Sequence, residues 1–463
     1  MLRGISTFAL LSVLGLGACA STGGDAVTPN SETSEAVAFH PFMPGVMPDR
    51  VILNLTQDPS TSMAVNWRSD ASAPEGFVQY AVATDGPGFN AVRETLTAES
   101  ELTHIQDEGE PLVVAHYHSA TLEGLTPNTQ YVYRVGDGSH WSEWFQFTTA
   151  GLEGEPFSFI YFGDAQNDLK SMWSRVIREA YKTLPSVNFM LHAGDLINSE
   201  DSDIEWGEWF YAGGFLHAQV PSVMTPGNHE YSRQMELSQQ WRPGFNLPKN
   251  GPEGVENLSE TVYYVDYQDM RLISLDADMS GDFESSARIQ AQWLDQVLRE
   301  NDKRWTAIFL HYPFYSTRAG RHHENLHTFF KPIIDRYGVD IVLQGHDHGY
   351  SRGMVANVPD GEMIRDERTG TMYVVSVSGP KMYPVEDLAW ADRKANGLQL
   401  FQVLTVDGDT LSYQAYTASG RLYDAFDIQK SDTGPNQLIN RIPEDAEEIW
   451  EPDYDQPSSY RRP

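Results

Sequence analysis

Apolar and polar residues alternate along the first part of the chain, from residue 48 to residue 150. The stretches 63–67 (MAVNW), 130–135 (QYVYRV) and 144–148 (WFQFT) place apolar side chains at every second position. A period of two predicts half-buried β-strands, and turn residues separate one stretch from the next. Several short strands within about a hundred residues predict a β-sandwich. We therefore expect an all-β domain over residues 48–150.

The pattern changes at residue 151, after which strands alternate with helices up to residue 430. Residues 169–184 and 286–300 repeat their apolar positions at the spacing of an α-helix. Apolar strand-like stretches lie around these helices. This order predicts an α/β domain built in layers, a β-sandwich flanked by helices. The later stretches 371–377 and 399–406 have no helix between them, so we expect them to be antiparallel strands.

Five apolar strands of the second domain each end at a residue that can bind a metal ion. These residues are Asp164, Asp195, Asn228, His311 and His346, with His348 two positions further on. In an open α/β sheet, ligands bind at the carboxyl ends of the strands, so these loops should meet at one edge. Two carboxylates, one amide and three imidazoles suit a pair of divalent cations. The pattern therefore predicts a two-metal site built for phosphate esters.

The ordered set of motifs resembles the metallophosphoesterase superfamily and, within it, the purple acid phosphatases. The matching stretches are Gly163-Asp164, Gly194-Asp195, Gly227-Asn228-His229-Glu230, His311 and residues 345–352. Plant-type purple acid phosphatases also carry an N-terminal fibronectin-like domain, and residues 122–131 are similar to a corner of fibronectin type III modules. A His-His pair after the strand-borne histidine is a further match, at His322-His323. The resemblance covers about residues 48–430.

The resemblance implies a role for each predicted ligand. Asp195 would bridge two metal ions, which lie about 3.5–4 Å apart in such enzymes. Two ionised aspartates against two divalent ions leave two positive charges, which match a phosphate dianion. The other implied ligands are Asp164 and His348 at site one, and Asn228, His311 and His346 at site two.

The resemblance also implies a hydrolytic mechanism in which a metal-bound hydroxide attacks phosphorus in line with the leaving group. The leaving alkoxide then needs a proton, and His229 and His323 are the candidate donors because imidazole titrates near neutral pH. His322 is an alternative because the loop is longer than the usual family spacing. Tyr350 and Arg352 either orient the ligands or the substrate, or pack beneath the metal loop.

Two positions depart from the family. Purple acid phosphatases have a tyrosine three residues after the bridging aspartate, where this chain has Asn198, and the wider superfamily often has a histidine where this chain has Gln166. Gln166 or Asn198 can offer only a neutral oxygen in place of these ligands. Without an anionic phenolate the preference for ferric iron should weaken. We expect two metal ions, from among Fe, Zn and Mn, and a colourless protein.

The formal net charge of the chain is -33, from 65 acidic and 32 basic residues. So acidic a protein is not expected to bind nucleic acid, since that requires basic patches. A phosphate ester is repelled by this overall charge. It must therefore be attracted by a local cationic site, which metal ions would supply.

The N-terminal residues predict export. Arg3 precedes an apolar stretch, residues 8–16, that is too short to span a membrane. The sequence Leu-Gly-Ala-Cys that follows resembles the lipobox of bacterial lipoproteins, which implies cleavage before Cys19 and lipid attachment to its sulfur. Cys19 is the only cysteine of the chain. An ordinary secretory signal with a chance cysteine is the alternative.

Composition divides the remaining chain into segments. We expect a lipoprotein signal peptide over residues 1–18, a flexible tether over 19–47 and an acidic, irregular tail over 431–463. The protein would then be anchored by its lipid to a bacterial membrane, in the periplasm or at the cell surface. The sequence does not predict the oligomeric state.

Three functions are compatible with these features. The resemblance favours a phosphomonoesterase of the acid phosphatase type. A phosphodiesterase or nucleotidase would use the same metal ligands, and a lipid-anchored binding protein with a degenerate metal centre is the third possibility. The complete set of site-two residues argues against the third possibility.

Overall fold

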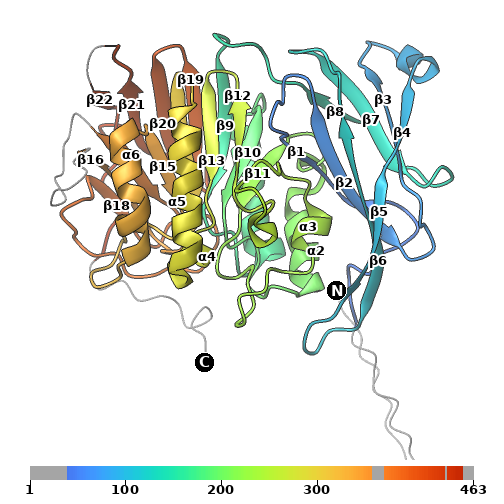
Figure 1. Ribbon diagram of the computed structural model, residues 1–463, viewed down its shortest axis with the longest axis horizontal. Coiled ribbons are helices and arrows are strands. Elements are labelled where there is room, and N and C mark those ends of the chain that lie inside the picture. Colours follow the sequence, from blue (N-terminus) through green and yellow to red (C-terminus); the bar gives the residue numbers. More distant parts are fainter. Residues whose placement is uncertain (1–38, 357–369, 433–434, 452–463) are drawn as a thin grey trace, which may run out of the picture. The chain divides into compact units, whose positions relative to one another are not determined.

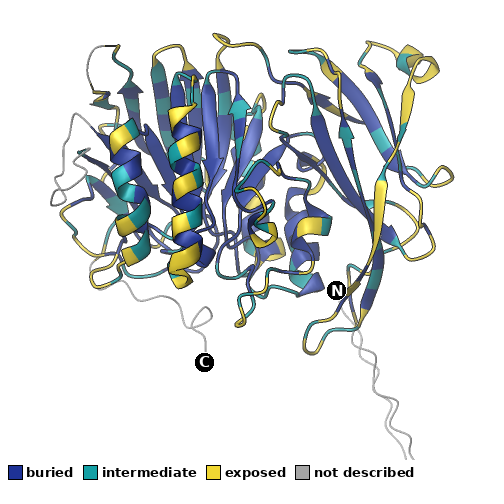
Figure 2. Ribbon diagram, viewed as in Figure 1, coloured by how far each residue is buried: buried dark blue, intermediate teal, exposed yellow. Residues whose placement is uncertain are grey.

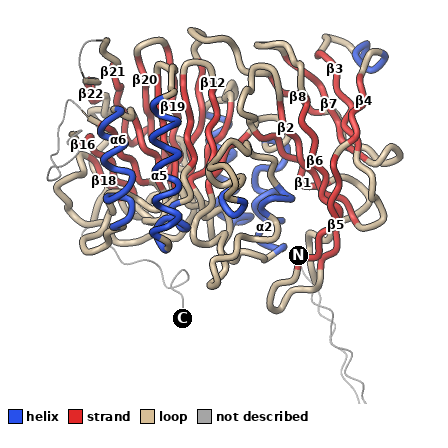
Figure 3. Tube along the Cα trace, viewed as in Figure 1, coloured by secondary structure: helices blue, strands red, loops and turns tan. Residues whose placement is uncertain are grey.

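The computed structural model describes residues 39–356, 370–432 and 435–451, and strands dominate it (Figure 3). The strands form three sheets of eleven, seven and four strands. Cys19 and the predicted signal peptide lie outside the described residues. Within the described ranges, no helix is long and apolar enough to cross a membrane.

The N-terminal domain is a sandwich of two antiparallel walls. One wall contains β1 (Asp49–Asn54), β2 (Met63–Asp70), β5 (Glu99–Ile105) and β6 (Val113–Leu122). The other contains β3 (Phe77–Val82), β4 (Glu94–Thr97), β7 (Gln130–Gly136) and β8 (Phe145–Thr148). Alternate residues of β8 are buried and exposed, as the period of two predicts. Trp67 and Tyr133 are fully buried in the core that the two walls share.

The first sheet of the second domain has parallel strands at its centre. These are β9 (Phe157–Phe162), β10 (Phe189–Ala193) and β11 (Ser222–Thr225). On one side the sheet continues through four antiparallel strands: β19 (Leu400–Asp407), β20 (Thr410–Thr417), β21 (Leu422–Gln429) and β22 (Gln437–Asn440). On its other side β11 pairs with β1, so one wall of the N-terminal sandwich and this sheet form a single eleven-stranded sheet (Figure 1).

The second sheet of this domain has seven strands. They are β12 (Tyr263–Tyr267), β13 (Met270–Ser274), β14 (Trp305–Leu310), β15 (Ile341–Gln344), β16 (Tyr350–Val355), β17 (Thr371–Val375) and β18 (Arg393–Ala395). Apolar side chains from both sheets, such as Phe159 and Phe309, share one core between them. Apolar side chains on the other face of the second sheet, such as Ile308, join a separate core with the helices.

Helices cover the outer faces of both sheets. The predicted helix at 169–184 is formed by η2 (Leu169–Trp173) and α1 (Ser174–Thr183), and these pack against α2 (Asp203–Gly213). The predicted helix at 286–300 is α5 (Glu284–Arg299), which lies beside α6 (Lys331–Tyr337) with its apolar face inward (Figure 2). The shorter helices are η1 (Pro87–Ala91), η3 (Gly214–Leu216), α3 (Trp241–Gly244), η4 (Glu256–Leu258), α4 (Ala277–Asp282) and η5 (Leu326–Phe330). The structure confirms a β-rich domain followed by a layered α/β domain.

The strand register brings the predicted ligand loops to one edge. In the first sheet Phe162 pairs with His192 and Ala193 pairs with Thr225, so β9, β10 and β11 end at the same level. In the second sheet Leu310 pairs with Gln344, which aligns the ends of β14 and β15. Because the two sheets are stacked, the loops after all five strands can meet.

The predicted tether and tail are both shorter than the sequence indicated. Residues 39–47 were expected in the tether, but His40 is buried and lies 3.2 Å from the Asp203 carboxylate. Residues 435–451 were expected in the tail, but they include β22, and Trp450 donates a hydrogen bond to the Val385 carbonyl. Neither segment has apolar periodicity, because single side chains and the backbone pairing of the exposed edge strand β22 attach them, and not a continuous apolar face.

A buried ion network joins the N-terminal domain to α2. The Asp203 carboxylate lies 2.8 Å from the Arg50 guanidinium and 3.0 Å from that of Arg68. Arg68 also lies 2.7 Å from Asp49, so each guanidinium has a carboxylate partner. Burial opposes ionisation of Asp203, but the two arginines and His40 hold the pKa of this carboxyl below its usual range.

We expect Asp203→Ala to destabilise the protein by about 3–5 kcal/mol, because it leaves the buried Arg50 guanidinium without its carboxylate and removes one of the two carboxylates of Arg68. Chemical denaturation of the variant and the wild type at pH 7 measures this difference. The pKa of Asp203 in the folded protein lies below the ordinary aspartate value of about 3.9. The stabilisation should therefore be present above about pH 4 and be lost as the pH falls through the folded-state pKa. Glu75→Ala, at an exposed position, is the control, and an equal loss in both variants would contradict the role of the network.

Candidate metal centre

Two groups of potential metal ligands meet at the aligned strand ends and share one carboxylate. Their ligand atoms lie within 4.8 Å of one another in each group. The first group contains Asp164, Asp195 and His348, and the second contains Asp195, His311 and His346. A carboxylate that belongs to both groups is placed as a bridge between two cations would be. The geometry therefore has the form that the sequence predicted, with Asp195 at its centre.

Glycines allow the ligand loops to approach one another closely. A Cβ atom on Gly227 would lie 2.3 Å from Oδ1 of Asp195. A Cβ atom on Gly345 would lie 2.7 Å from Oδ2 of Asp164. Asp195 itself has a φ of 51°, in the left-handed region that non-glycine residues seldom adopt. Such strain is found at functional sites, where the surrounding structure holds it in place.

Backbone carbonyls orient two of the imidazoles. Nδ1 of His311 donates to the Ala193 carbonyl at 2.9 Å, and Nδ1 of His348 donates to the Lys381 carbonyl at 2.8 Å. A carbonyl can only accept, so Nε2 of each ring keeps its lone pair for a metal ion. Nε2 of His311 lies 3.2 Å from the Asp195 carboxylate and 3.2 Å from Oδ1 of Asn228. Asn228 thus joins the second group, as predicted for site two.

The two carboxylates lie in a fully buried, low-dielectric setting. Burial raises the pKa of Asp164 well above its ordinary value, and His311 offsets only part of this effect. Burial acts on Asp195 as well, but the imidazoles of His311 and His229 hold the pKa of Asp195 below its usual range. Two adjacent buried carboxylates require compensating positive charge. Oxygen and imidazole donors around them suit divalent cations of the zinc, iron or manganese type.

Comparison with known proteins agrees with this geometry. Residues 48–149 match the model of the purple acid phosphatase N-terminal domain. Residues 158–350 match the model of the calcineurin-like phosphoesterases. The chain belongs to the purple acid phosphatase-like metallophosphoesterases. Members of this class are phosphoric ester hydrolases, and the ligand groups support a binuclear metal centre.

The relatives of this metallophosphoesterase include animal and plant proteins. Acid phosphatase type 7 of Mus musculus is 26% identical over 352 residues, which cover 67% of this chain and 74% of the relative. The Fe(3+)-Zn(2+) purple acid phosphatase 12 of Arabidopsis thaliana is 25% identical, over 54% of this chain and 57% of the relative. Probable inactive purple acid phosphatase 1 of the same plant is 23% identical, over 68% and 58%.

Among solved structures, a purple acid phosphatase from seeds of yellow lupin (Lupinus luteus) has a similar fold. The TM-score is 0.67 at 20% sequence identity, and the match covers 83% of this chain and 75% of that one. The structure of PhoD gives a TM-score of 0.61 at 13% identity, over 89% and 95% of the two chains. These similarities show the fold of the metallophosphoesterase and not its substrate.

Gln166 enters the metal centre, at the position where relatives often have histidine. Its side-chain nitrogen lies 2.7 Å from Oδ2 of Asp195 and 3.0 Å from Nε2 of His348. Its buried Oε1 has no hydrogen-bond partner among the described residues. Rotation of the amide by half a turn would direct this oxygen between the same two ligands. The amide therefore fits as a neutral oxygen donor to a cation at site one.

Asn198 occupies the position of the family's tyrosine and hydrogen-bonds to Asn167 and His229. Its side-chain oxygen accepts a hydrogen bond from the Asn167 amide at 3.1 Å. Its backbone carbonyl accepts a hydrogen bond from Nδ1 of His229 at 2.5 Å. Of the two predicted substitutes for the phenolate, Gln166 lies among the ligands, while Asn198 orients a neighbouring amide and the His229 ring.

Glu230 fixes two ligand loops, a role that the sequence analysis did not predict. Its carboxylate is fully buried and accepts hydrogen bonds from backbone N–H groups only. Oε2 accepts from Gly227 at 2.7 Å and from Asp195 at 2.9 Å, and Oε1 accepts from Leu196 at 2.7 Å. The sequence did contain a signal for this role, since Glu230 directly follows two predicted site residues, Asn228 and His229. An acidic residue in that position is rarely without a partner.

The two histidines of the His322-His323 pair have different surroundings. The His322 ring is exposed and stacks on His327, with centroids 4.5 Å apart. The His323 ring lies 5.7 Å from that of His346, and its Nε2 is shielded from solvent without a hydrogen-bond partner in the described ranges. The structure therefore places His323 beside the ligands and His322 away from them.

Tyr350 and Arg352 lie beneath the metal loop and not among the ligands. The Tyr350 hydroxyl donates to the Asp424 carboxylate at 2.7 Å. The Arg352 guanidinium donates to both oxygens of Asp424, at 2.9 and 3.0 Å. All three side chains are fully buried. Of the two roles considered for this pair, packing beneath the loop that carries His346 and His348 agrees with the structure.

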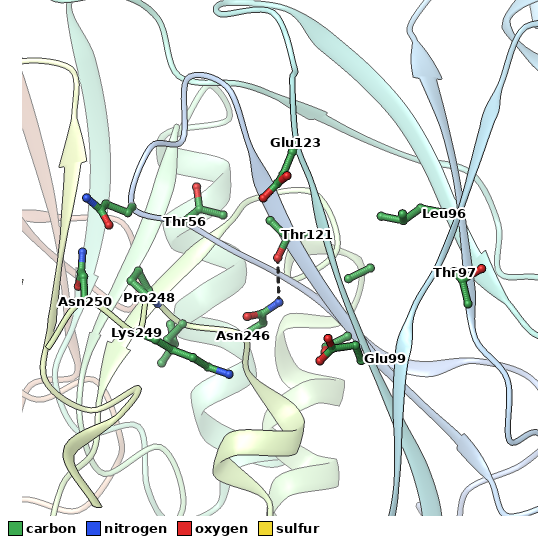
Figure 4. Close-up of a pocket in the computed structure, with 14 residues that line it drawn as sticks. Thr56, Leu96, Thr97, Glu99, Thr121, Glu123, Asn246, Pro248, Lys249 and Asn250 are labelled. Atoms are coloured by element: carbon green, nitrogen blue, oxygen red, sulfur yellow. Dashed lines mark hydrogen bonds between the residues drawn. The ribbon is translucent and has the colours of Figure 1, made fainter. Parts of the chain in front are cut away.

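A separate cavity of about 700 Å³ lies between the N-terminal domain and the loop over residues 246–250 (Figure 4). Its walls carry amide, hydroxyl and carboxylate groups, and the Asn246 amide donates to the Thr121 hydroxyl at 3.2 Å. None of the predicted site residues lines it. This cavity belongs to the junction between the two domains and not to the metal centre.

We expect Glu230→Gln to lower the affinity for metal ions by about 10–100-fold, as loss of an outer-shell partner does in other metalloproteins. In the wild type, backbone N–H groups of the two ligand loops donate to the Glu230 carboxylate oxygens. In the variant, the NH₂ group of the glutamine amide would replace one of these oxygens and could not accept their hydrogen bonds. Metal content after dialysis against graded chelator measures the effect. Glu236→Gln, at an exposed position of the same loop, is the control. Unchanged metal retention in Glu230→Gln would contradict the role assigned to Glu230.

Proposed function

We propose that this protein is a phosphomonoesterase of the acid phosphatase type that acts at a binuclear metal centre. The observation that carries the proposal is the pair of ligand groups that share Asp195. The relatives named acid phosphatases support a monoester substrate. Another relative is named as probably inactive, but here both ligand groups are present and share Asp195, which favours an active centre.

With two cations bound, the ligand groups would form a local positive site on an acidic protein. Two cations at this centre would supply Lewis-acid charge to the phosphate and would acidify a water molecule. Asp164 and Asp195 offset two of the four positive charges, so a dianionic phosphate is attracted despite the net charge of -33. The substrate is expected to bind with its phosphate at the ligands and its ester group outward.

Two imidazoles are available to protonate the leaving oxygen. The His229 backbone N–H donates to Oδ1 of Asp195 at 3.0 Å, so this residue is adjacent to the predicted site one. His323 lies beside His346 and hence beside site two. When the bond from phosphorus to the ester oxygen breaks, a proton moves from the imidazole to that oxygen and leaves the imidazole neutral. We assign this donation to His323, because its Nε2 has no partner among the described residues. Burial lowers the pKa of His323 to about 4, so the protonated donor is populated at acidic pH, which agrees with a phosphatase of the acid type.

The metal ions are proposed to be divalent. Asn198 stands where purple acid phosphatases have a phenolate, and Gln166 offers only a neutral oxygen, so site one carries one negative charge less. A ferric ion is stabilised by anionic ligands, and their loss favours zinc, manganese or ferrous iron. The change at Asn198 therefore sets the preference, and the neutral Gln166 amide does not restore the lost charge.

Asp195→Asn should reduce hydrolysis of p-nitrophenyl phosphate by more than about 100-fold, since loss of a shared ligand costs more than loss of an outer-shell group. The wild type should hydrolyse this monoester faster than bis(p-nitrophenyl) phosphate, and its iron-loaded form should have no intense visible band. Asp302→Asn, at an exposed position, is the control and should be fully active. Full activity of Asp195→Asn, or faster hydrolysis of the diester, would rule out the proposed function.

We also propose that the protein is exported and anchored by a lipid on Cys19, which lies outside the described residues. The support is the N-terminal sequence, in which the only cysteine follows an apolar stretch of export-signal length. In a bacterial host, Cys19→Ser should release the protein from the membrane fraction, and mass spectrometry of the wild type should find acyl chains on residue 19. Ser21→Ala is the control. Retention of Cys19→Ser in the membrane fraction would contradict the anchor.

A further inference from the structure

Tyr312, the residue after the ligand His311, packs against three imidazoles of the site. Its ring is stacked on that of His323, with centroids 4.5 Å apart and planes 17° from parallel. The same ring lies 4.5 Å from His346 at 58° and 5.7 Å from His311 at 42°. One aromatic ring thus joins the predicted proton donor to two of the predicted ligands.

A buried carboxylate lies behind the Tyr312 ring. The Tyr312 hydroxyl faces Asp278, which α4 carries and which is 1% exposed. Both Asp278 oxygens lack a hydrogen-bond partner of ordinary geometry among the described residues. Gly281 on the same helix permits the close packing, since a Cβ atom there would lie 3.0 Å from the Tyr312 ring. The Tyr312 ring is therefore packed against α4 as well as against His323.

The segment that carries His323 is attached at both of its ends. On one side the Asn325 amide donates to the carbonyls of Ser280 and Gly281 on α4, at 2.8 and 3.1 Å. On the other side Arg321 pairs with the buried Asp347, which stands between the ligands His346 and His348. These contacts fix the backbone of the segment. The orientation of the His323 ring depends on the neighbouring rings, Tyr312 and His346.

We propose that Tyr312 is a positioning residue that holds the His323 imidazole against the leaving-group oxygen, and that close packing against α4 at Gly281 fixes the Tyr312 ring. The inference rests on the proposed function, because it concerns the proton donor of that reaction. Contact with Tyr312 also distinguishes the two histidines. His323 is stacked on Tyr312, whereas His322 is exposed and stacks on His327.

Stacking matters here because proton donation depends on geometry. A donor must lie within hydrogen-bond distance of the leaving oxygen, and a displacement of about 1 Å can cost a hundredfold in rate. A stacked neighbour restricts both the tilt and the displacement of an imidazole. The effect depends on the leaving group, since an alkoxide needs the proton whereas p-nitrophenolate leaves without it.

The test compares two monoesters in Tyr312→Ala. Hydrolysis of an alkyl phosphate should slow by about 100-fold, as expected for a misplaced general acid, while hydrolysis of p-nitrophenyl phosphate changes little. Tyr312→Phe keeps the stacked ring but loses the hydroxyl that faces Asp278, so it should slow the alkyl ester less than Tyr312→Ala does. His322→Ala is the control for the neighbouring imidazole and should have no selective effect.

A double variant separates positioning from a general loss of structure. If Tyr312 acts through His323, then His323→Ala shows the same selective loss, and adding Tyr312→Ala to it causes no further loss. Metal content should equal that of the wild type in all variants. Equal losses with both esters, additive losses in the double variant, or loss of metal from Tyr312→Ala would each overturn the proposal.

Chemical modification of the histidines tests the positioning role of Tyr312 even if the enzyme hydrolyses neither ester. Diethyl pyrocarbonate modifies accessible imidazoles, and peptide mass spectrometry reports His322 and His323 separately. Tyr312→Ala should make His323 react several-fold faster, while His322, which is already exposed, reacts at its wild-type rate. An unchanged rate at His323 overturns the positioning role. Wild-type inactivity towards both esters overturns the proposed function instead.

Discussion

The metal centre depends on one set of hydrogen bonds, those that the buried Glu230 carboxylate accepts from backbone N–H groups of two loops. The loop after β10 carries Asp195 and the loop after β11 carries Asn228, and Glu230 accepts from both. Without Glu230, the backbone N–H groups of these two loops would be buried without acceptors beside the Asp164 and Asp195 carboxylates. The strained backbone of Asp195 is maintained because three consecutive N–H groups, from residue 195 to 197, point to one carboxylate.

Charge distinguishes the centre from that of its relatives at site one. Site two keeps an amide and two imidazoles, the donors that the family uses. At site one, Asn198 stands at the position of the phenolate and Gln166 at that of a histidine, so a cation there would meet one negative charge less, while Asp195 remains the shared ligand. On a protein with a net charge of -33, a site with one negative ligand less holds a phosphate more readily. The neutral ligand thus agrees with the acidic surface.

Much of this architecture could be predicted from local patterns. Asp164, Asp195, His311 and His346 were found because each follows an apolar strand, and strand ends on one sheet meet. Tyr312 and Asp278 were not predicted. Tyr312 lies just after a strand and Asp278 lies in the first turn of a short helix, and only their contacts in the folded protein give them a role. The boundaries at residues 47 and 431 were wrong because a short segment held by His40 or Trp450 has no periodicity.

The sequence by itself determined the two domain types, the strand ends and the ligand chemistry, because periodicity and strand-terminal residues are local properties of the chain. Only the tertiary structure decided the choices between near-equivalent residues. It placed Gln166 and not Asn198 among the ligands, and His323 and not His322 beside them. It also joined β1 to β11, through the single register pair Asn54 and Ser222. Each of these outcomes depends on contacts between residues far apart in the chain, and such contacts leave no periodic signal in the sequence.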